Sequence, residues 1–107
     1  MLQSVIMPLT PNSIVQAIDY EAVTIGAVAT GLTPSKVALA WRVVIRLDDG
    51  SEIRFRTDGP APTASVGFPA FQLDQIELEH QEAVNFLAIR TSAPDMTAHV
   101  IYYGRPT

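Results

Sequence analysis

The clearest pattern in the chain is a period-two alternation of apolar and polar residues between Lys36 and Arg56. Side chains alternate between the two faces of a β-strand, so this pattern predicts two strands that each bury one face. Asp48-Asp49-Gly50 separates the two runs and has the composition of a tight turn, so we expect a β-hairpin. The positions predicted to face the core are Trp41, Val43, Ile45, Leu47, Ile53 and Phe55.

The register of this predicted hairpin follows from its apolar faces. A three-residue loop over residues 48–50 pairs Ile45 with Ile53 and Val43 with Phe55, so that both apolar faces coincide. A two-residue loop would instead place apolar residues opposite charged ones. The longer loop needs a residue with positive φ at its end, and glycine at position 50 meets that need.

The rest of the chain is divided into short segments by eight prolines and six glycines, a spacing that favours strands over helices. We therefore expect an all-β fold, a small β-sandwich or barrel of six to eight short, mostly antiparallel strands. It forms a single domain over residues 1–107, with residues 1–12 as a candidate extended N-terminal arm. The further predicted strands are Leu2–Met7 (or an arm), Ser13–Tyr20 (with a helix as the alternative), Glu21–Thr30 with a bulge at Gly26, Ile76–Glu79, Val84–Arg90 and Thr97–Tyr103.

Two connecting segments have specific expectations. Thr57–Pro69 contains three prolines and two glycines and is predicted to be a long loop, of the kind that often forms an interaction surface. Phe71 and Leu73 differ in parity from the apolar residues of the strand that follows. We therefore expect Asp74-Gln75 to form a turn or bulge that lets all of these apolar residues face the core.

Composition narrows the functional classes. The net charge is −4, which argues against a nucleic-acid partner because such proteins need a basic face. No apolar run is long enough for a membrane helix, and the N-terminus does not resemble a secretory signal, so we expect no membrane partner. Cysteine is absent, which excludes disulfides and thiolate metal sites. Only 17% of residues are charged, which is compatible with apolar surface that serves a protein partner. The alternative is that a small domain simply exposes some alanine and valine.

Residues with catalytic chemistry do not form a recognisable site in the sequence. His80 has acidic neighbours, but a solvated strand end explains them better than a metal site. His99 is expected to be an exposed or hydrogen-bonded histidine of a sheet. No nucleophile motif or phosphate-binding loop is present. We expect a protein that is not an enzyme and that needs no cofactor or metal.

Four residues are candidates for an interface. Arg54 and Arg56 share the outward face of one predicted strand, about 7 Å apart, and could clamp a carboxylate of a partner. Asp58 follows them and could pair with either arginine. Tyr102 and Tyr103 point to opposite faces, and we take Tyr103 as the surface residue because tyrosine often anchors interfaces. The alternative is a solvated sheet face with weak local ion pairs.

A resemblance begins at this strand and its loop. Ile53–Gly67, with the run RTDGPAPTASVG, resembles a strand and loop found in small β-rich structural accessory proteins of tailed bacteriophages. Three later segments are similar to the same family: Gln75–Glu79, Phe86–Arg90 and the paired tyrosines at 102–103. The chain departs from the family pattern at Phe71–Asp74, where that pattern has small residues and a glycine, and this leaves the turn conformation open.

The resemblance covers roughly residues 21–103 and implies a role in the virion. It implies a non-enzymatic structural protein that decorates (cements) the head by binding the major capsid protein or other virion proteins, as a homo-oligomer. The chain would then be located in the virion, after assembly in the host cytoplasm. The alternatives are a neck, tail or fibre component, or a carbohydrate-binding β-sandwich on a host-facing appendage. The last alternative needs an exposed aromatic platform, and the alternation argues against it by placing Trp41 in the core.

Overall fold

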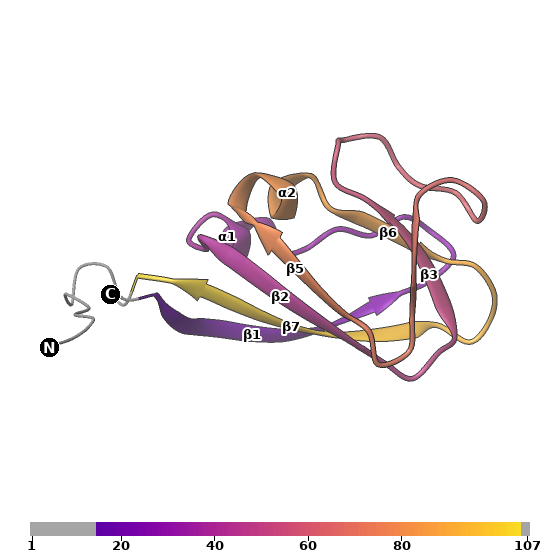
Figure 1. Ribbon diagram of the computed structural model, residues 1–107, viewed down its shortest axis with the longest axis horizontal. Coiled ribbons are helices and arrows are strands. Elements are labelled where there is room, and N and C mark those ends of the chain that lie inside the picture. The colour runs from indigo at the N-terminus through magenta and orange to yellow at the C-terminus, as the bar shows by residue number, and fades with distance from the viewer. Residues whose placement is uncertain (1–14, 106–107) are drawn as a thin grey trace, which may run out of the picture.

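Short apolar segments form seven strands and two short helices in the computed structural model, which describes residues 15–105. The strands make two antiparallel sheets that enclose one core, so the expected all-β sandwich is confirmed (Figure 1). The predicted strand or arm at Leu2–Met7, and the arm over residues 1–12, lie outside the described residues. The elements are β1 (Gln16–Ile25), α1 (Pro34–Val37), β2 (Arg42–Asp48), β3 (Glu52–Arg56), β4 (Phe68–Phe71), β5 (Gln75–Glu79), α2 (His80–Asn85), β6 (Leu87–Arg90) and β7 (Met96–Gly104).

The larger sheet has the strand order β1-β7-β2-β5. Strand β7 lies in its interior, and its residues alternate between buried and half-buried along the whole strand. Met96, Ala98, Val100 and Tyr102 point into the core and are at most 2% exposed. Tyr102 and Tyr103 therefore point to opposite faces, as the alternation predicted, and Tyr103 is the one on the outer face of the sheet.

Strand β1 forms one edge of the larger sheet and pairs with β7 over its full length. One strand covers most of the two segments predicted separately as Ser13–Tyr20 and Glu21–Thr30, so the extended alternative is confirmed from Gln16 onward. The irregularity in its pairing falls between Ala17 and Asp19. The bulge predicted at glycine 26 is not there, because β1 ends one residue before it.

The smaller sheet has the strand order β4-β3-β6. Ile53 of its central strand β3 is completely buried. The loop predicted over Thr57–Pro69 is present but ends earlier, because β4 begins at Phe68. Pro69 lies within a strand without conflict, since β4 is an edge strand and an edge position does not require every backbone N–H.

The predicted hairpin between β2 and β3 is wrong, because these strands belong to different sheets. Ile45 pairs with Val100 and Ile76 rather than with Ile53. The tight turn is real and Gly50 has the expected positive φ of 111°, but the turn carries the chain from one sheet to the other. Ile45 and Ile53 are buried in the observed fold and would also be buried in the predicted hairpin. The apolar pattern therefore could not distinguish β2 and β3 as neighbours in one sheet from β2 and β3 facing each other across the core.

The strand predicted over Val84–Arg90 is confirmed from Leu87 to Arg90, but its first two residues, Val84 and Asn85, belong to helix α2. A capping box begins this helix: the Glu82 side chain accepts a hydrogen bond from the Glu79 backbone N–H at 2.9 Å. The spacing Glu79-x-x-Glu82 is therefore a local helix signal that competes with the β-rich residues after it. A second helix missed by the sequence, α1, has its proline at the start, where no N–H donor is needed.

Three large apolar residues predicted to face the core lie at the surface. Trp41 is 44% exposed because it precedes β2 and lies beyond the end of the core, although it has the parity of the buried residues. Phe71 is 51% and Leu73 64% exposed, whereas Ile76 and Leu78 are buried as predicted. The turn predicted at Asp74-Gln75 is misplaced: the chain turns at Gln72-Leu73, and Gln75 already belongs to β5. This turn leaves the side chains of Phe71 and Leu73 exposed instead of bringing all four apolar residues into the core.

Candidate interaction surface

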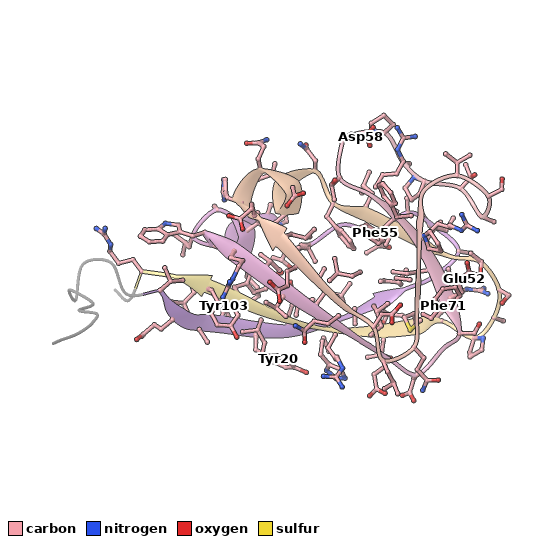
Figure 2. The ribbon with its side chains drawn as sticks, in the orientation of Figure 1. Tyr20, Glu52, Phe55, Asp58, Phe71 and Tyr103 are labelled. Atoms are coloured by element: carbon pink, nitrogen blue, oxygen red, sulfur yellow. The ribbon has the colours of Figure 1, made fainter. Side chains whose placement is uncertain are left out.

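The outer face of the smaller sheet combines arginines with apolar side chains. Cross-strand pairing places Arg54 between Pro69 and Ile89, and Arg56 beside Leu87. Phe71 lies on the same face, opposite Glu52 (Figure 2). We call this surface the small-sheet face, formed by Arg54, Arg56, Pro69, Phe71, Leu87 and Ile89. An outer face that only meets solvent is commonly polar, whereas arginine and aromatic residues are enriched at protein interfaces.

Arg54 is held in place by groups of its own sheet. Its Nη1 donates a hydrogen bond to the Gly67 carbonyl oxygen at 3.2 Å, and its Nε lies 3.5 Å from the Glu52 carboxylate. Gly67 has a φ of 131°, and a Cβ there would approach the Phe55 carbonyl oxygen to 3.0 Å. Glycine is therefore required at the position that brings the loop against the arginine.

Arg56 and Asp58 form a two-pronged ion pair. The guanidinium Nε and Nη2 donate to the two carboxylate oxygens of Asp58 at 2.9 and 2.7 Å. These hydrogen bonds hold the pKa of the Asp58 carboxyl below its usual range and raise the pKa of Arg56. The predicted clamp of two arginines on a partner carboxylate is thus modified, because Arg56 already binds a carboxylate of its own chain.

A groove of about 480 Å³ borders this ion pair. Val66 and Phe68 line it together with Arg56, Thr57 and Asp58. Phe68 is 67% exposed and packs one side of its ring against Phe55, with 5.9 Å between the ring centroids. Phe68 pairs with Phe55 and shares the parity of the buried Ala70, so this groove lies at the edge of the inner side of the sheet and is separate from the small-sheet face.

Tyr103 lies on a different surface from the other predicted interface residues. It is on the outer face of the larger sheet, where the Arg42 guanidinium carbon lies 5.2 Å from its ring centroid. Figure 2 shows Asp58 near one end of the molecule and Tyr103 toward the other. The structure therefore brings together Arg54, Arg56 and Asp58 but not Tyr103.

The histidines make hydrogen bonds within the fold. His99 Nδ1 lies 2.6 Å from the Tyr20 hydroxyl, and its Nε2 lies 3.5 Å from a carboxylate oxygen of Asp48 on the open outer face of the larger sheet. His80 Nδ1 lies 2.8 Å from the Ala40 carbonyl oxygen. Within residues 15–105, no three histidine, aspartate or glutamate side chains gather as a metal site would require.

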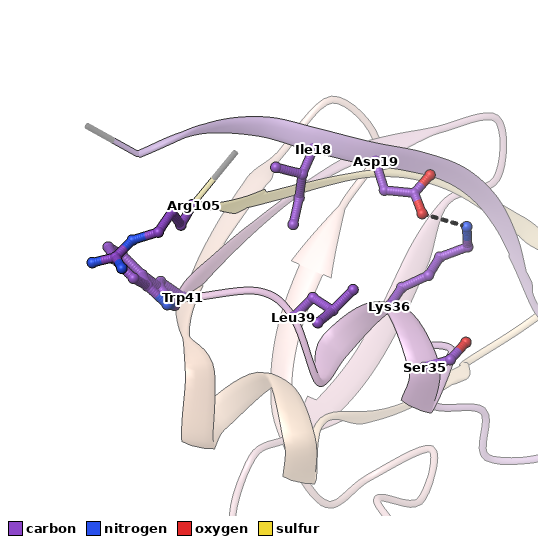
Figure 3. Close-up of a pocket in the computed structure, with 7 residues that line it drawn as sticks. All are labelled: Ile18, Asp19, Ser35, Lys36, Leu39, Trp41 and Arg105. Atoms are coloured by element: carbon purple, nitrogen blue, oxygen red, sulfur yellow. Dashed lines mark hydrogen bonds and ion pairs between the residues drawn. The ribbon is translucent and has the colours of Figure 1, made fainter. Parts of the chain in front are cut away.

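A second groove, of about 380 Å³, lies beside Arg105, the last described residue (Figure 3). Ile18 and Leu39 line it together with the exposed ring of Trp41. Asp19 and Lys36 form a 2.7 Å ion pair along it, and this hydrogen bond lowers the pKa of the Asp19 carboxyl. The sequence missed this groove because the alternation assigned the tryptophan to the core.

Comparisons with known proteins leave the family open: no family model, curated protein or solved structure matches this chain. Neither of the helices in the described part of the chain has the length and apolar character to cross a membrane. The functional argument therefore depends on the surfaces of the molecule itself.

Proposed function

We propose that this chain is a non-enzymatic structural protein of a tailed-bacteriophage virion, which decorates the head by binding the major capsid protein. The observation that carries the proposal is the small-sheet face, where Phe71, Leu87 and Ile89 accompany two arginines on an outer surface. Its aromatic, apolar and arginine side chains are of the types enriched at protein interfaces. The resemblance of Ile53–Gly67 to phage accessory proteins supports the same role.

The mode of binding follows from how each group is placed. Phe71 is 51% exposed and offers apolar area that a partner would remove from water. Arg54 and Arg56 are already oriented by hydrogen bonds. When a partner accepts hydrogen bonds from their remaining N–H groups, little further side-chain entropy is lost. We infer a capsid surface with apolar side chains and carboxylate or carbonyl acceptors as the partner.

The copy number in the particle tests the role. Virions of the phage or prophage that encodes this chain are purified, and the chain is quantified against the major capsid protein by mass spectrometry. A nearly stoichiometric amount supports head decoration. A few copies per particle would move the chain to the neck, tail or a fibre, and its absence from virions would contradict the structural role.

A pair of matched variants tests the small-sheet face. Phe71→Ser should weaken binding to particles that lack the chain, whereas Tyr20→Ser should not, because Tyr20 is similarly exposed (53%) but lies on the outer face of the other sheet. Arg54→Ala combined with Arg56→Ala should also weaken capsid binding or self-association while the fold remains intact. Equal binding by Phe71→Ser and wild type would exclude this face as the contact.

A carbohydrate-binding module is the second candidate, and one observation favours it. Trp41 is 44% exposed beside a groove, so the aromatic platform that such a module needs is present after all. Titration with glycans of the host surface, followed by Trp41 fluorescence, tests this alternative. A saturable change would support it, and an unchanged spectrum would leave the virion role as the better proposal.

A further inference from the structure

Among the described strands, β1, β4, β5 and β6 form the edges of the two sheets, and the last three carry features that discourage pairing with another chain. β4 has four residues and contains Pro69, which has no N–H to donate. β5 has five residues and exposes Glu77 and Glu79. β6 has four residues and is bridged by Thr30, which exchanges two backbone hydrogen bonds of 2.9 Å with Ala88. These three edges are therefore protected.

Strand β1 is the long edge, and it has no such protection over most of its length (Figure 1). It has ten residues and contains neither proline nor lysine. Its irregularity lies near its start, and its pairing with β7 is regular from Tyr20 onward. Its acidic side chains are held within the domain. Asp19 accepts from Lys36 at 2.7 Å, and Glu21 accepts from the Thr33 hydroxyl at 2.7 Å.

The backbone groups of β1 that face away from β7 follow from the alternation of the hydrogen-bond ladder. The Leu47 N–H donates to the Asp74 carbonyl oxygen at 3.0 Å, toward β5, so the neighbouring residues of β2 bond toward β7. Carried through the registers of β2 with β7 and of β7 with β1, this places the N–H and C=O groups of Tyr20, Ala22 and Thr24 on the open side. The Tyr20 N–H accordingly donates to the carboxylate of the preceding residue at 2.8 Å.

We propose that a second copy of this chain pairs with this edge, β1 against β1, antiparallel about a two-fold axis at Ala22. Ala22 then lies opposite Ala22 of the second copy, and Tyr20 lies opposite Thr24. Backbone groups of opposite residues bond each other in such pairs, so the open N–H and C=O groups find partners. The two larger sheets become one continuous sheet. A two-fold axis closes the assembly, so no edge of β1 remains open.

Self-complementarity favours a second copy over an unrelated strand. A register that keeps both inner faces buried must set outer-face residues opposite each other. A register centred on Glu21 would set two like charges directly opposite, which is destabilising. A register centred on Val23 would set Tyr20 opposite Gly26. The carbonyl oxygen of that glycine already accepts from the Arg90 N–H at 2.9 Å, so this register gains fewer new hydrogen bonds. The proposed register avoids both conflicts.

The register predicts which introduced cysteine can cross-link two copies, since the chain has no cysteine of its own. Ala22→Cys should give a disulfide-linked dimer on mild oxidation, because Cα atoms of a hydrogen-bonded pair lie about 5.5 Å apart, within disulfide reach. Thr24→Cys is the matched control, since Thr24 is also exposed on the outer face but lies opposite Tyr20. It should cross-link only when Tyr20→Cys is added to the same chain. Non-reducing gel electrophoresis measures all three.

Sedimentation velocity over a range of protein concentrations measures the association itself. The full chain should form dimers, and Ala22→Pro should weaken them roughly tenfold or more, because proline removes an open N–H and its ring obstructs the facing strand. Ala22→Lys should also weaken them by setting two like charges at the axis. Val28→Lys is the control, since it adds the same charge to a side chain that is 78% exposed beyond the end of β1. Far-UV circular dichroism shows that each variant keeps its fold.

Amide hydrogen exchange shows which side of β1 is covered. Exchange at Ala22 and Thr24 should slow as the protein concentration rises, whereas Val23 bonds toward β7 and should be protected at every concentration. A chain that stays monomeric at millimolar concentration, or a dimer that neither Ala22 variant weakens, would overturn the proposal. Cross-linking by Thr24→Cys alone would overturn the register.

The proposal goes beyond the virion role and can fail separately from it. Phe71→Ser changes the small-sheet face and should leave the dimer intact, because Phe71 belongs to β4 of the other sheet. A loss of capsid binding with an intact dimer would therefore concern the small-sheet face alone. A dimer that Phe71→Ser dissociates would overturn the assignment of the contact to β1.

Discussion

Replacement of Gly50 by alanine should destabilise the protein strongly, because the turn between the sheets leaves no room for a Cβ. Gly50 has a φ of 111°, and an L-residue there costs roughly 1–2 kcal/mol from its own backbone. A Cβ would also lie 2.9 Å from the Met96 Cα and 3.1 Å from the Asp95 carbonyl oxygen. Both contacts are with backbone, so relieving them must shift the start of β7, at a further cost of about 1–3 kcal/mol.

The chain contains a matched control for this prediction. Gly59 also has a φ of 111°, but a Cβ there meets nothing within 4 Å. Gly59→Ala should therefore lower the free energy of unfolding only by the backbone strain of the positive φ, roughly 1–2 kcal/mol. The difference in unfolding free energy between the two variants isolates the contacts of the added Cβ with Asp95 and Met96.

Urea unfolding followed by far-UV circular dichroism measures both variants against wild type. We expect Gly50→Ala to lose at least about 1 kcal/mol more than Gly59→Ala, a further drop in melting temperature of roughly 4–8 °C for a domain of this size. Equal losses would refute the reasoning, because they would show that the strands relax around the added methyl group at no cost.

Three further predictions concern single side chains. Tyr102→Phe removes the hydroxyl that donates to the Glu21 carboxylate and should cost about 1–3 kcal/mol at neutral pH, measured by urea unfolding. Burial and the neighbouring Glu21 carboxylate raise the pKa of Tyr102 in the folded state. The stability linked to the protonated hydroxyl is therefore complete below about pH 10, the pKa of an unfolded tyrosine, and is lost as the pH rises toward the folded pKa. Over that pH range the phenylalanine variant should lose less stability than wild type. Leu73→Gly should raise the melting temperature, because Leu73 has a φ of 75° that glycine adopts without strain, and its exposed side chain contributes little burial. A lower melting temperature would contradict the inference that the backbone is strained at this position. Arg56→Gln should raise the pKa of Asp58 in an NMR titration, and an unchanged pKa would show that the ion pair does not persist in solution.

The candidate surface was only partly accessible to sequence reasoning. The outward position of Arg54 and Arg56 followed from alternation within β3 alone, and Asp58 was near enough in sequence to be paired with them. Leu87 and Ile89 were missed because the alternation of β6 does not say which parity faces outward. The exposure of Trp41 was missed for a related reason: parity predicts a face, but it does not predict where along the strand the core ends.

The sequence by itself determined the local preferences: short strands, a positive φ at Gly50, and burial of one face in β2, β5 and β7. These local preferences depend on the spacing of apolar residues along a strand and on the backbone conformation of single residues. Both are determined by residues that are close in sequence. Only the tertiary structure decided which strands pair. Val43 and Ile45 are buried equally well beside β3 or across the core from it, so burial energy does not distinguish a hairpin from a crossing between sheets. The choice depends on β7, whose residues are distant in sequence and occupy the place beside β2.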